Sequence, residues 1–167
     1  MLFWIGGHLL QFIYTQMFMF VLICLVESIS DGEVACYNVY EMLLILNFVL
    51  ASTMFIGHFT YDFSDGLFKE FFTNHMIYTA GIVPGIFIIV LTYEIWAKKI
   101  ASMNLSMLAY VFSVGLFVMG GFIGAAISGI NVVIPAHYHG SIVGISVAMM
   151  GFVYLFIFKE QIIHNIS

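Results

Sequence analysis

The sequence predicts an all-α membrane protein that crosses the bilayer five times, and its composition excludes the other broad classes. Of its 167 residues, 63% are hydrophobic and only 8% are charged, whereas soluble domains carry roughly 25% charged residues. A soluble monomer with so little charge would expose apolar patches that aggregate. An aromatic content of 17% excludes a disordered chain. Four lysines, no arginine and a net charge of −5 exclude nucleic acid as a partner, because nothing would neutralise its phosphates.

Five apolar stretches are long enough to cross a membrane, since a helix needs about 20 mostly apolar residues to span roughly 30 Å of hydrocarbon. The predicted helices comprise residues 2–26, 40–61, 71–96, 105–130 and 133–158. Short polar segments separate them, at residues 27–33, 62–66, 98–99 and 128–131. Stretches of this length fit helices better than the alternating strands of a membrane barrel. We therefore predict a single transmembrane domain over residues 1–167.

The first stretch is interpreted as a membrane helix and not as a secretory signal peptide. It lacks a basic segment at its start and a small-residue cleavage site, and it contains His8 and Gln11. In the last stretch, Pro135 fits the first turn of a helix, where its missing N–H group is not needed.

The lysines predict the orientation of the chain in the membrane. With five spans, Lys98, Lys99 and Lys159 fall on the side of the C-terminus, and Lys69 alone falls on the side of the N-terminus. Because cytoplasmic loops carry the excess of cationic residues, we expect the N-terminus outside and the C-terminus in the cytoplasm.

Five histidines are predicted to share one depth in the membrane. A helix rises 1.5 Å per residue. Counted in this way, the outer third of the bilayer contains five histidines from four helices: His8, His58, His75, His137 and His139. A lone intramembrane histidine is often a hydrogen-bond partner between helices, and that interpretation stays open for each of them singly. Together they favour a buried metal or cofactor site, because neutral imidazole is a common metal ligand and an apolar bundle with inward histidines suits haem.

The spacing of the last two histidines adds a geometric constraint. Residues two apart on an α-helix point about 200° from each other, so His137 and His139 face opposite sides of the last helix. They cannot easily share one metal ion, but they can hold two cofactors with the helix between them.

These motifs resemble subunit I of the haem-copper oxidase superfamily, which comprises terminal oxygen reductases and nitric oxide reductases. The glycine-rich segment 118–124 followed by the histidine pair of segment 133–144 resembles that family's ninth and tenth helices. Trp4 four residues before His8 resembles its sixth helix, and segment 56–59 resembles the end of its seventh. Segment 82–85 resembles a stretch of its eighth helix. The resemblance is collinear over nearly the whole chain and implies five helices of a larger oxidase-like bundle.

The resemblance implies two haems and a second metal. His137 would be the axial ligand of a high-spin haem that binds substrate, and His139 would be one ligand of a low-spin haem that delivers electrons. His8 and His58 would bind the second metal, which is copper in oxidases and non-haem iron in some nitric oxide reductases. Gly121 and Gly124 belong to a run that either packs helices closely or lets a haem approach.

Two departures from the family pattern concern the second metal. The family has two adjacent histidines at the end of its seventh helix, and here only His58 is present. Asp62 or His75 would complete the ligand set, although Asp62 also fits a solvated loop. The tyrosine of oxygen reductases is absent from its usual position, and Tyr61 is the candidate substitute. These losses shift the expectation from oxygen reduction toward nitric oxide reduction, or toward an atypical or degenerate site.

The helix that supplies the second ligand of the low-spin haem has no counterpart in this sequence. The resemblance therefore implies a split subunit I, whose remaining helices come from one or more partner chains. It further implies an electron-donating subunit, cytochrome c or quinol as partner, with membrane lipid around the bundle. The expected location is a bacterial or archaeal plasma membrane, or a mitochondrial inner membrane.

The sequence leaves three alternative functions open. The first is the haem- and metal-binding part of an enzyme that reduces O2 to water, with or without proton translocation, or NO to N2O, and that is not active alone. The second is a non-catalytic haem-binding subunit for electron transfer or assembly, with a degenerate second-metal site. The third is a membrane transporter whose histidines line a pore.

Overall fold

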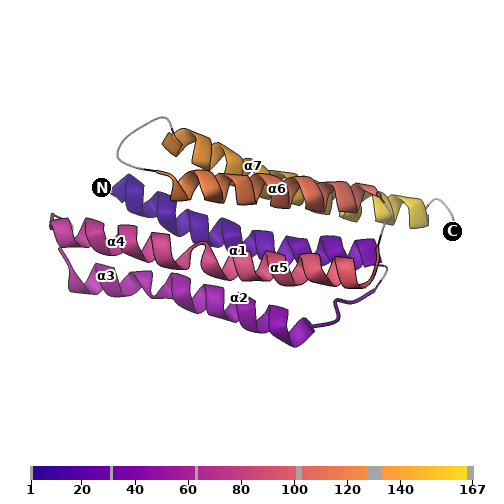
Figure 1. Ribbon diagram of the computed structural model, residues 1–167, viewed down its shortest axis with the longest axis horizontal. Coiled ribbons are helices and arrows are strands. Elements are labelled where there is room, and N and C mark those ends of the chain that lie inside the picture. Colours follow the sequence, from indigo (N-terminus) through magenta and orange to yellow (C-terminus); the bar gives the residue numbers. More distant parts are fainter. Residues whose placement is uncertain (1, 31, 63, 101–102, 128–132, 165–167) are drawn as a thin grey trace. The chain divides into compact units, whose positions relative to one another are not determined.

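In the computed structural model every described element is an α-helix (Figure 1). The structure describes the backbone of residues 2–30, 32–62, 64–100, 103–127 and 133–164, and their side chains except at residues 2–5, 8 and 158–164. The helices are α1 (Leu2–Ser30), α2 (Tyr37–Ser52), α3 (Met54–Thr60), α4 (Gly66–Thr79), α5 (Ile82–Ala97), α6 (Leu105–Ala125) and α7 (Val133–His164).

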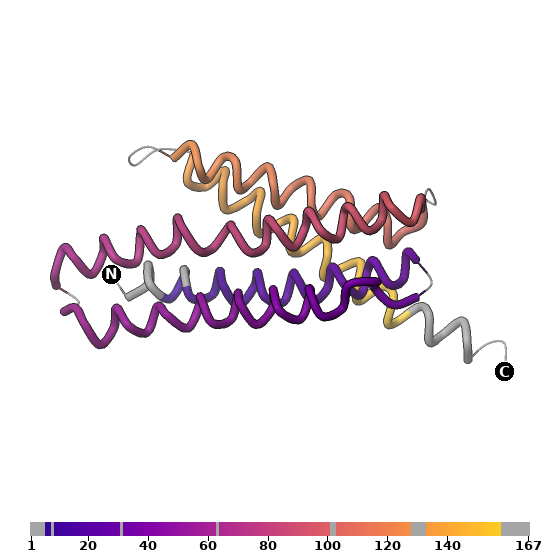
Figure 2. The backbone as a smooth tube through the Cα atoms, turned by 60° about the horizontal axis from the view of Figure 1, so that its bottom comes forward, coloured from indigo at the N-terminus to yellow at the C-terminus, as the bar shows by residue number. Residues whose placement is uncertain are grey.

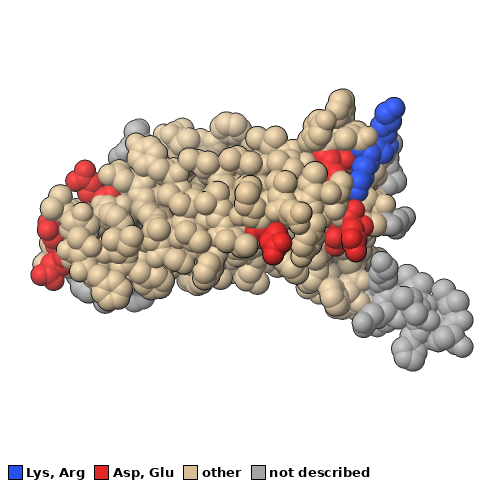
Figure 3. Space-filling view, turned by 90° about the horizontal axis from the view of Figure 1, so that it is seen from below, with Lys and Arg blue, Asp and Glu red and all other residues tan. Residues whose placement is uncertain are grey.

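The prediction of five membrane-spanning segments is confirmed at the level of helix length and apolarity. The described residues contain five helical stretches that are long and apolar enough to cross a bilayer: Leu9–Ser30, Tyr37–Thr60, Gly66–Ala97, Leu105–Ala125 and Val133–Ile157. On the face drawn in Figure 3, carboxylates and lysines cover a small part of the described surface, and the rest of the described surface carries other residue types. The chain is therefore a multi-pass membrane protein of the all-α class.

Two of the predicted helices are interrupted. The predicted helix 40–61 is divided at Thr53, where the hydroxyl of Thr53 donates to the carbonyl of Leu50 at 2.7 Å, and such bonding back to the preceding turn bends helices. The predicted helix 71–96 is divided between α4 and α5. The cause is Pro84, which has no N–H group for the carbonyl of Ala80 four residues earlier.

Several predicted helix boundaries differ from the observed ones. The helix predicted from residue 71 begins at Gly66, because the side chain of Asp65 caps it by accepting from the backbone N–H of Leu67 at 3.1 Å. The predicted start at residue 105 is observed, with Asn104 as the cap. The helices predicted to end at residues 26 and 158 continue to Ser30 and His164, and α6 ends at Ala125 and not at residue 130. The predicted turn at residues 128–131 lies outside the described residues.

The chain divides into two compact units, and α1 and α5 each contribute to both. The first unit comprises residues 1–19 and 36–89. Its core is the cluster of Phe12, Met54, Phe68 and Phe72, each at most 3% exposed. Figure 2 shows α3 and α4 side by side, running back from the turn that joins them.

A polar pair joins α1 and α2 inside the first unit. The amide of Asn47, which is 1% exposed, donates to Oε1 of Gln16 at 2.7 Å. Gln16 in turn donates to the carbonyl of Leu44 at 3.2 Å. Such amide bonds between membrane helices fix which faces of the two helices meet.

The second unit comprises residues 20–35 and 90–167, and its main contact is between α6 and α7 (Figure 1). Small residues allow the two backbones to approach closely. A Cβ atom added at Gly144 would lie 2.7 Å from the backbone N of Phe117 and from the carbonyl O of Ser113. A Cβ atom on Gly140 would lie 2.8 Å from Cα of Gly120. No larger residue fits at these positions unless the helices separate.

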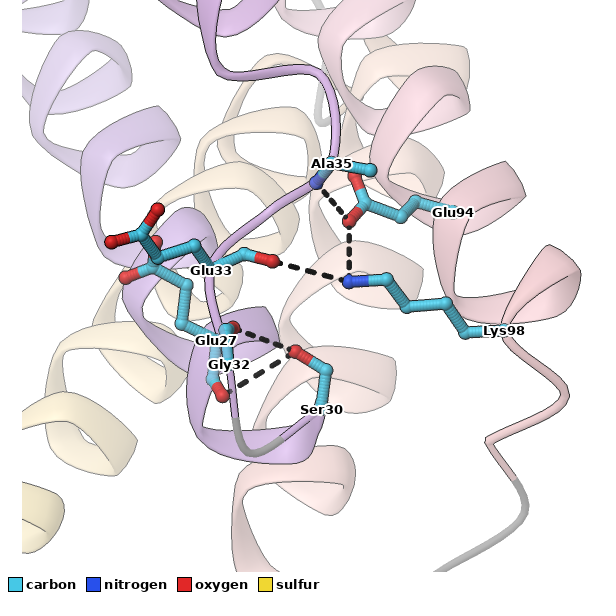
Figure 4. A network of polar contacts seen from close by, with 7 residues as sticks. All are labelled: Glu27, Ser30, Gly32, Glu33, Ala35, Glu94 and Lys98. Carbon is cyan, nitrogen blue, oxygen red and sulfur yellow. Dashed lines mark hydrogen bonds and ion pairs between the residues drawn. The ribbon is translucent and has the colours of Figure 1, made fainter.

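A buried carboxylate fixes the segment between α1 and α2 to the end of α5, also in the second unit (Figure 4). Glu94 is 7% exposed, accepts from the backbone N–H of Ala35 at 2.6 Å and pairs with Nζ of Lys98 at 2.8 Å. Lys98 also donates to the carbonyl of Glu33 at 3.2 Å. Lys98 thus balances the charge of Glu94, and the N–H of Ala35 and the carbonyl of Glu33 are both hydrogen-bonded.

We predict that Gly144→Val lowers the free energy of unfolding in detergent micelles by about 2 kcal/mol, because the added methyl groups force α6 and α7 apart. Gly115→Val is the matched control on α6, since nothing lies within 4 Å of a Cβ atom at Gly115. Its effect should stay within about 0.5 kcal/mol. Equal losses in the two variants, measured by denaturant titration, would contradict the close-packing interpretation.

Candidate functional site

The described histidine side chains lie in both units. The first unit holds His58 on α3 and His75 on α4, and the second unit holds His137 and His139 on α7. His8 lies in α1, but its side chain is outside the described part of the structure, so its predicted role as a metal ligand stays a prediction.

His137 has one ring nitrogen bound to the backbone of α6 and one that remains. Its Nδ1 lies 2.7 Å from the carbonyl oxygen of Gly120. A carbonyl oxygen can only accept, so Nδ1 carries the proton, and in the neutral ring the lone pair is then on Nε2. The ring is partly exposed. This is the arrangement in which a histidine ligates a metal through Nε2 while a backbone carbonyl orients it.

Gly124 makes room for the ring of His137. A Cβ atom at Gly124 would lie 2.6 Å from Nδ1 and 2.7 Å from Cε1 of that ring. The observed contact of Gly124 is therefore with the histidine. Nothing lies within 4 Å of a Cβ atom at Gly121, so the space beside that residue is open.

His139 adopts the same tautomer as His137 on another side of α7. Its Nδ1 lies 2.7 Å from the carbonyl oxygen of Pro135, one turn earlier in the same helix, and its side chain is exposed. Nε2 of His139 therefore carries the lone pair in the neutral ring. Nδ1 of His137 bonds to α6, whereas Nδ1 of His139 bonds within α7, which agrees with the angular separation of residues two apart.

His75 has partners within the protein for both ring nitrogens. Its Nε2 lies 2.7 Å from Oγ1 of Thr53, and its Nδ1 lies 3.1 Å from Oγ1 of Thr79. The ring of Phe12 meets it edge-on, with 5.7 Å between ring centroids. The histidine thus joins the interruption after α2 to the end of α4, and in this arrangement neither nitrogen is left for a metal ion.

The remaining predicted residues of the second metal lie around the α3–α4 turn. His58 is partly exposed, and its ring meets those of Phe68 and Phe72 edge-on, with centroids 5.6 and 5.2 Å away. Tyr61 ends α3, and its ring centroid lies 5.7 Å from that of Phe71. Asp62 is exposed, and its carbonyl accepts from the backbone N–H of Asp65 at 2.9 Å.

These side chains do not form a three-ligand cluster within the described part of the chain. Among those residues, no three of His, Cys, Asp and Glu lie close enough together to hold a metal ion. A site made of His58, Asp62 and His75 alone is therefore not assembled there. The set that includes His8 is not tested, since that side chain is not described.

A groove along α4 was not predicted from the sequence. It is open, has a volume of about 410 Å³ and is lined by Tyr61, Leu67, Glu70, Phe71, Asn74, His75 and Tyr78. The signal was present, because Glu70, Asn74 and Tyr78 recur every four residues and share one helix face. It was overlooked because residues 66–70 were placed outside the predicted helix.

Comparison with known proteins relates the chain to one longer protein. It is 39% identical to a protein of Rickettsia prowazekii (strain Madrid E) described as "Uncharacterized protein RP382", over 183 residues covering 92% of this chain and 36% of that protein. The chain thus spans about a third of the length of this relative. No known protein family and no solved structure matches the chain.

We predict that ¹⁵N NMR of the cofactor-free chain shows His137 and His139 as the tautomer protonated at Nδ1. Gly124→Ala should change the Nδ1 signal of His137 and leave that of His139 unchanged, because the added methyl group overlaps the ring of His137. Gly121→Ala is the matched control, and it should change neither signal. A Gly124→Ala spectrum identical to that of the wild type would show that the ring lies elsewhere.

Proposed function

We propose that the chain supplies haem-ligating histidines to a multi-chain membrane oxidoreductase of the haem-copper oxidase type. The observation that carries this proposal is the tautomer shared by His137 and His139. Both imidazoles lie in one membrane-spanning helix, both bind a backbone carbonyl through Nδ1, and both keep Nε2 for a ligand. A purely structural histidine in a membrane has no need for an open nitrogen, because an unsatisfied polar atom there is costly.

The surroundings of His137 fit an axial haem ligand. The carbonyl of Gly120 orients the ring, and Gly124 leaves the space that the ring occupies. A hydrogen bond of this kind raises the basicity of the ligating nitrogen and restricts rotation of the ring. His137 would hold the high-spin haem and His139 the low-spin haem. When bound, haem supplies one-electron chemistry and a site for a diatomic molecule.

The proposal requires helices from elsewhere, since His139 provides one ligand and a low-spin haem has two. In the proposed complex, partner chains supply those helices, and a donor subunit, cytochrome c or quinol delivers electrons.

The described candidates for the second metal make other contacts. His75 has both nitrogens in hydrogen bonds, and His58 faces phenylalanine rings. Copper or iron held by His8 and His58, with Asp62 or His75, remains a prediction, as does the role of Tyr61. The reduction of O2 or NO depends on that centre, so the identity of the substrate is part of the proposal.

The proposal predicts separate losses in two variants of the purified complex. His137→Ala should abolish the high-spin haem absorbance, and His139→Ala should abolish the low-spin absorbance, because each removes one axial ligand. His75→Gln is the matched control and should retain both haems, since its amide can still bond to Thr53. Absorption spectra of the oxidised and reduced complex provide the measurement.

Three results would redirect the proposal. If both alanine variants retain both haems, the ligand assignment is wrong. If the wild-type complex shows no haem absorbance, the transporter function is favoured. Haem without turnover of O2 or NO would favour the non-catalytic electron-transfer subunit.

A further inference from the structure

The groove along α4 combines one carboxylate with several aromatic rings. Tyr61, Phe71 and Tyr78 supply the rings, and Glu70 supplies the charge. Tyr61 and Phe71 lie 5.7 Å apart by ring centroids. The side chain of Glu70 is exposed and, within the described residues, makes no hydrogen bond or ion pair. No lysine lines the groove, so Glu70 is the charged residue of its lining.

The groove lies at the boundary of the membrane. The stretch Gly66–Ala97 has 32 residues, about 12 more than the roughly 20 that cross the hydrocarbon. Lys98 and Lys99 directly follow its C-terminal end, where α5 is apolar up to Glu94. The surplus therefore falls in α4, whose first turns carry Lys69, Glu70 and Asn74. This places the groove at the level of the lipid headgroups.

Carboxylates surrounded by aromatic faces bind organic ammonium ions. The ring faces attract the cation through their quadrupole, within about 6 Å of the centroid, and the carboxylate adds direct charge attraction. An anionic headgroup would be repelled by Glu70. The volume of about 410 Å³ falls within the roughly 300–1,000 Å³ of small-molecule sites.

We propose that this groove binds the ammonium headgroup of a phosphatidylethanolamine molecule. A lipid is the occupant because the groove is on a membrane-spanning stretch and is flanked by an exposed apolar side chain. Ile77, at the membrane-facing end of these surplus residues of α4, is 60% exposed, and acyl chains can cover it. The headgroup then lies between Glu70 and the tyrosines. This site is independent of haem and goes beyond the proposed function.

The test counts lipids retained by the full chain. The chain is placed in nanodiscs with equal amounts of phosphatidylethanolamine and phosphatidylglycerol, and native mass spectrometry compares the two bound lipids. We expect the wild type to retain the ethanolamine lipid about tenfold over the glycerol lipid. Glu70→Gln should reduce this preference to near parity. Glu41→Gln, an exposed carboxylate on α2 outside the groove, should leave it unchanged.

Two further measurements separate the outcomes. Tyr78→Leu should weaken the preference about threefold while Tyr78→Phe keeps it, because only the leucine removes a ring face. Soluble phosphoethanolamine should not displace the lipid at equal concentration. Equal retention of both lipids by the wild type, or an unchanged preference in Glu70→Gln with wild-type helicity by circular dichroism, would overturn the proposal. Displacement by the soluble compound would overturn the choice of a lipid.

Discussion

The close contact between α6 and α7 is the constraint on which the orientation of the His137 ring depends. Glycines at positions 120, 140 and 144 bring the two backbones together. Only at this separation does the carbonyl of Gly120 come within hydrogen-bond distance of His137. A membrane offers no hydrophobic force to press helices together, so small residues and polar bonds must hold them. The same glycines therefore serve packing and the orientation of an imidazole.

Hydrogen bonding distinguishes the histidines of this chain from one another. His75 binds two threonines and joins secondary-structure elements. His137 and His139 each bind one carbonyl and keep a nitrogen with a lone pair. All three are histidines in membrane-spanning stretches. Whether a ring nitrogen is available as a ligand therefore depends on the hydrogen bonds that the ring nitrogens make.

The sequence predicted the five apolar helices because bilayer thickness imposes a minimum length that hydropathy reveals. It also predicted that His137 and His139 face different sides, which follows from helical periodicity alone. It did not predict the interruptions at Thr53 and before Pro84, since both residues are also tolerated within continuous membrane helices. The bond between His75 and Thr53 is a tertiary contact, for which the local pattern carries no signal. The spacing of Glu70, Asn74 and Tyr78 carried a signal for the groove, but the predicted helix began after Glu70. The side chain of His8 is not described, so the predicted second-metal set remains a prediction.

The two helix interruptions make the α3–α4 hairpin a mechanical element of its own. It begins after Thr53 and ends before Ala80 and Gly81. His75 bonds to Thr53 at one end and to Thr79 at the other. Phe68 and Phe72 pack within the hairpin against His58. Phe12 of α1 belongs to the same buried cluster as Phe68 and Phe72. Any substitution that shifts this cluster would therefore displace His58 and the lining of the groove together.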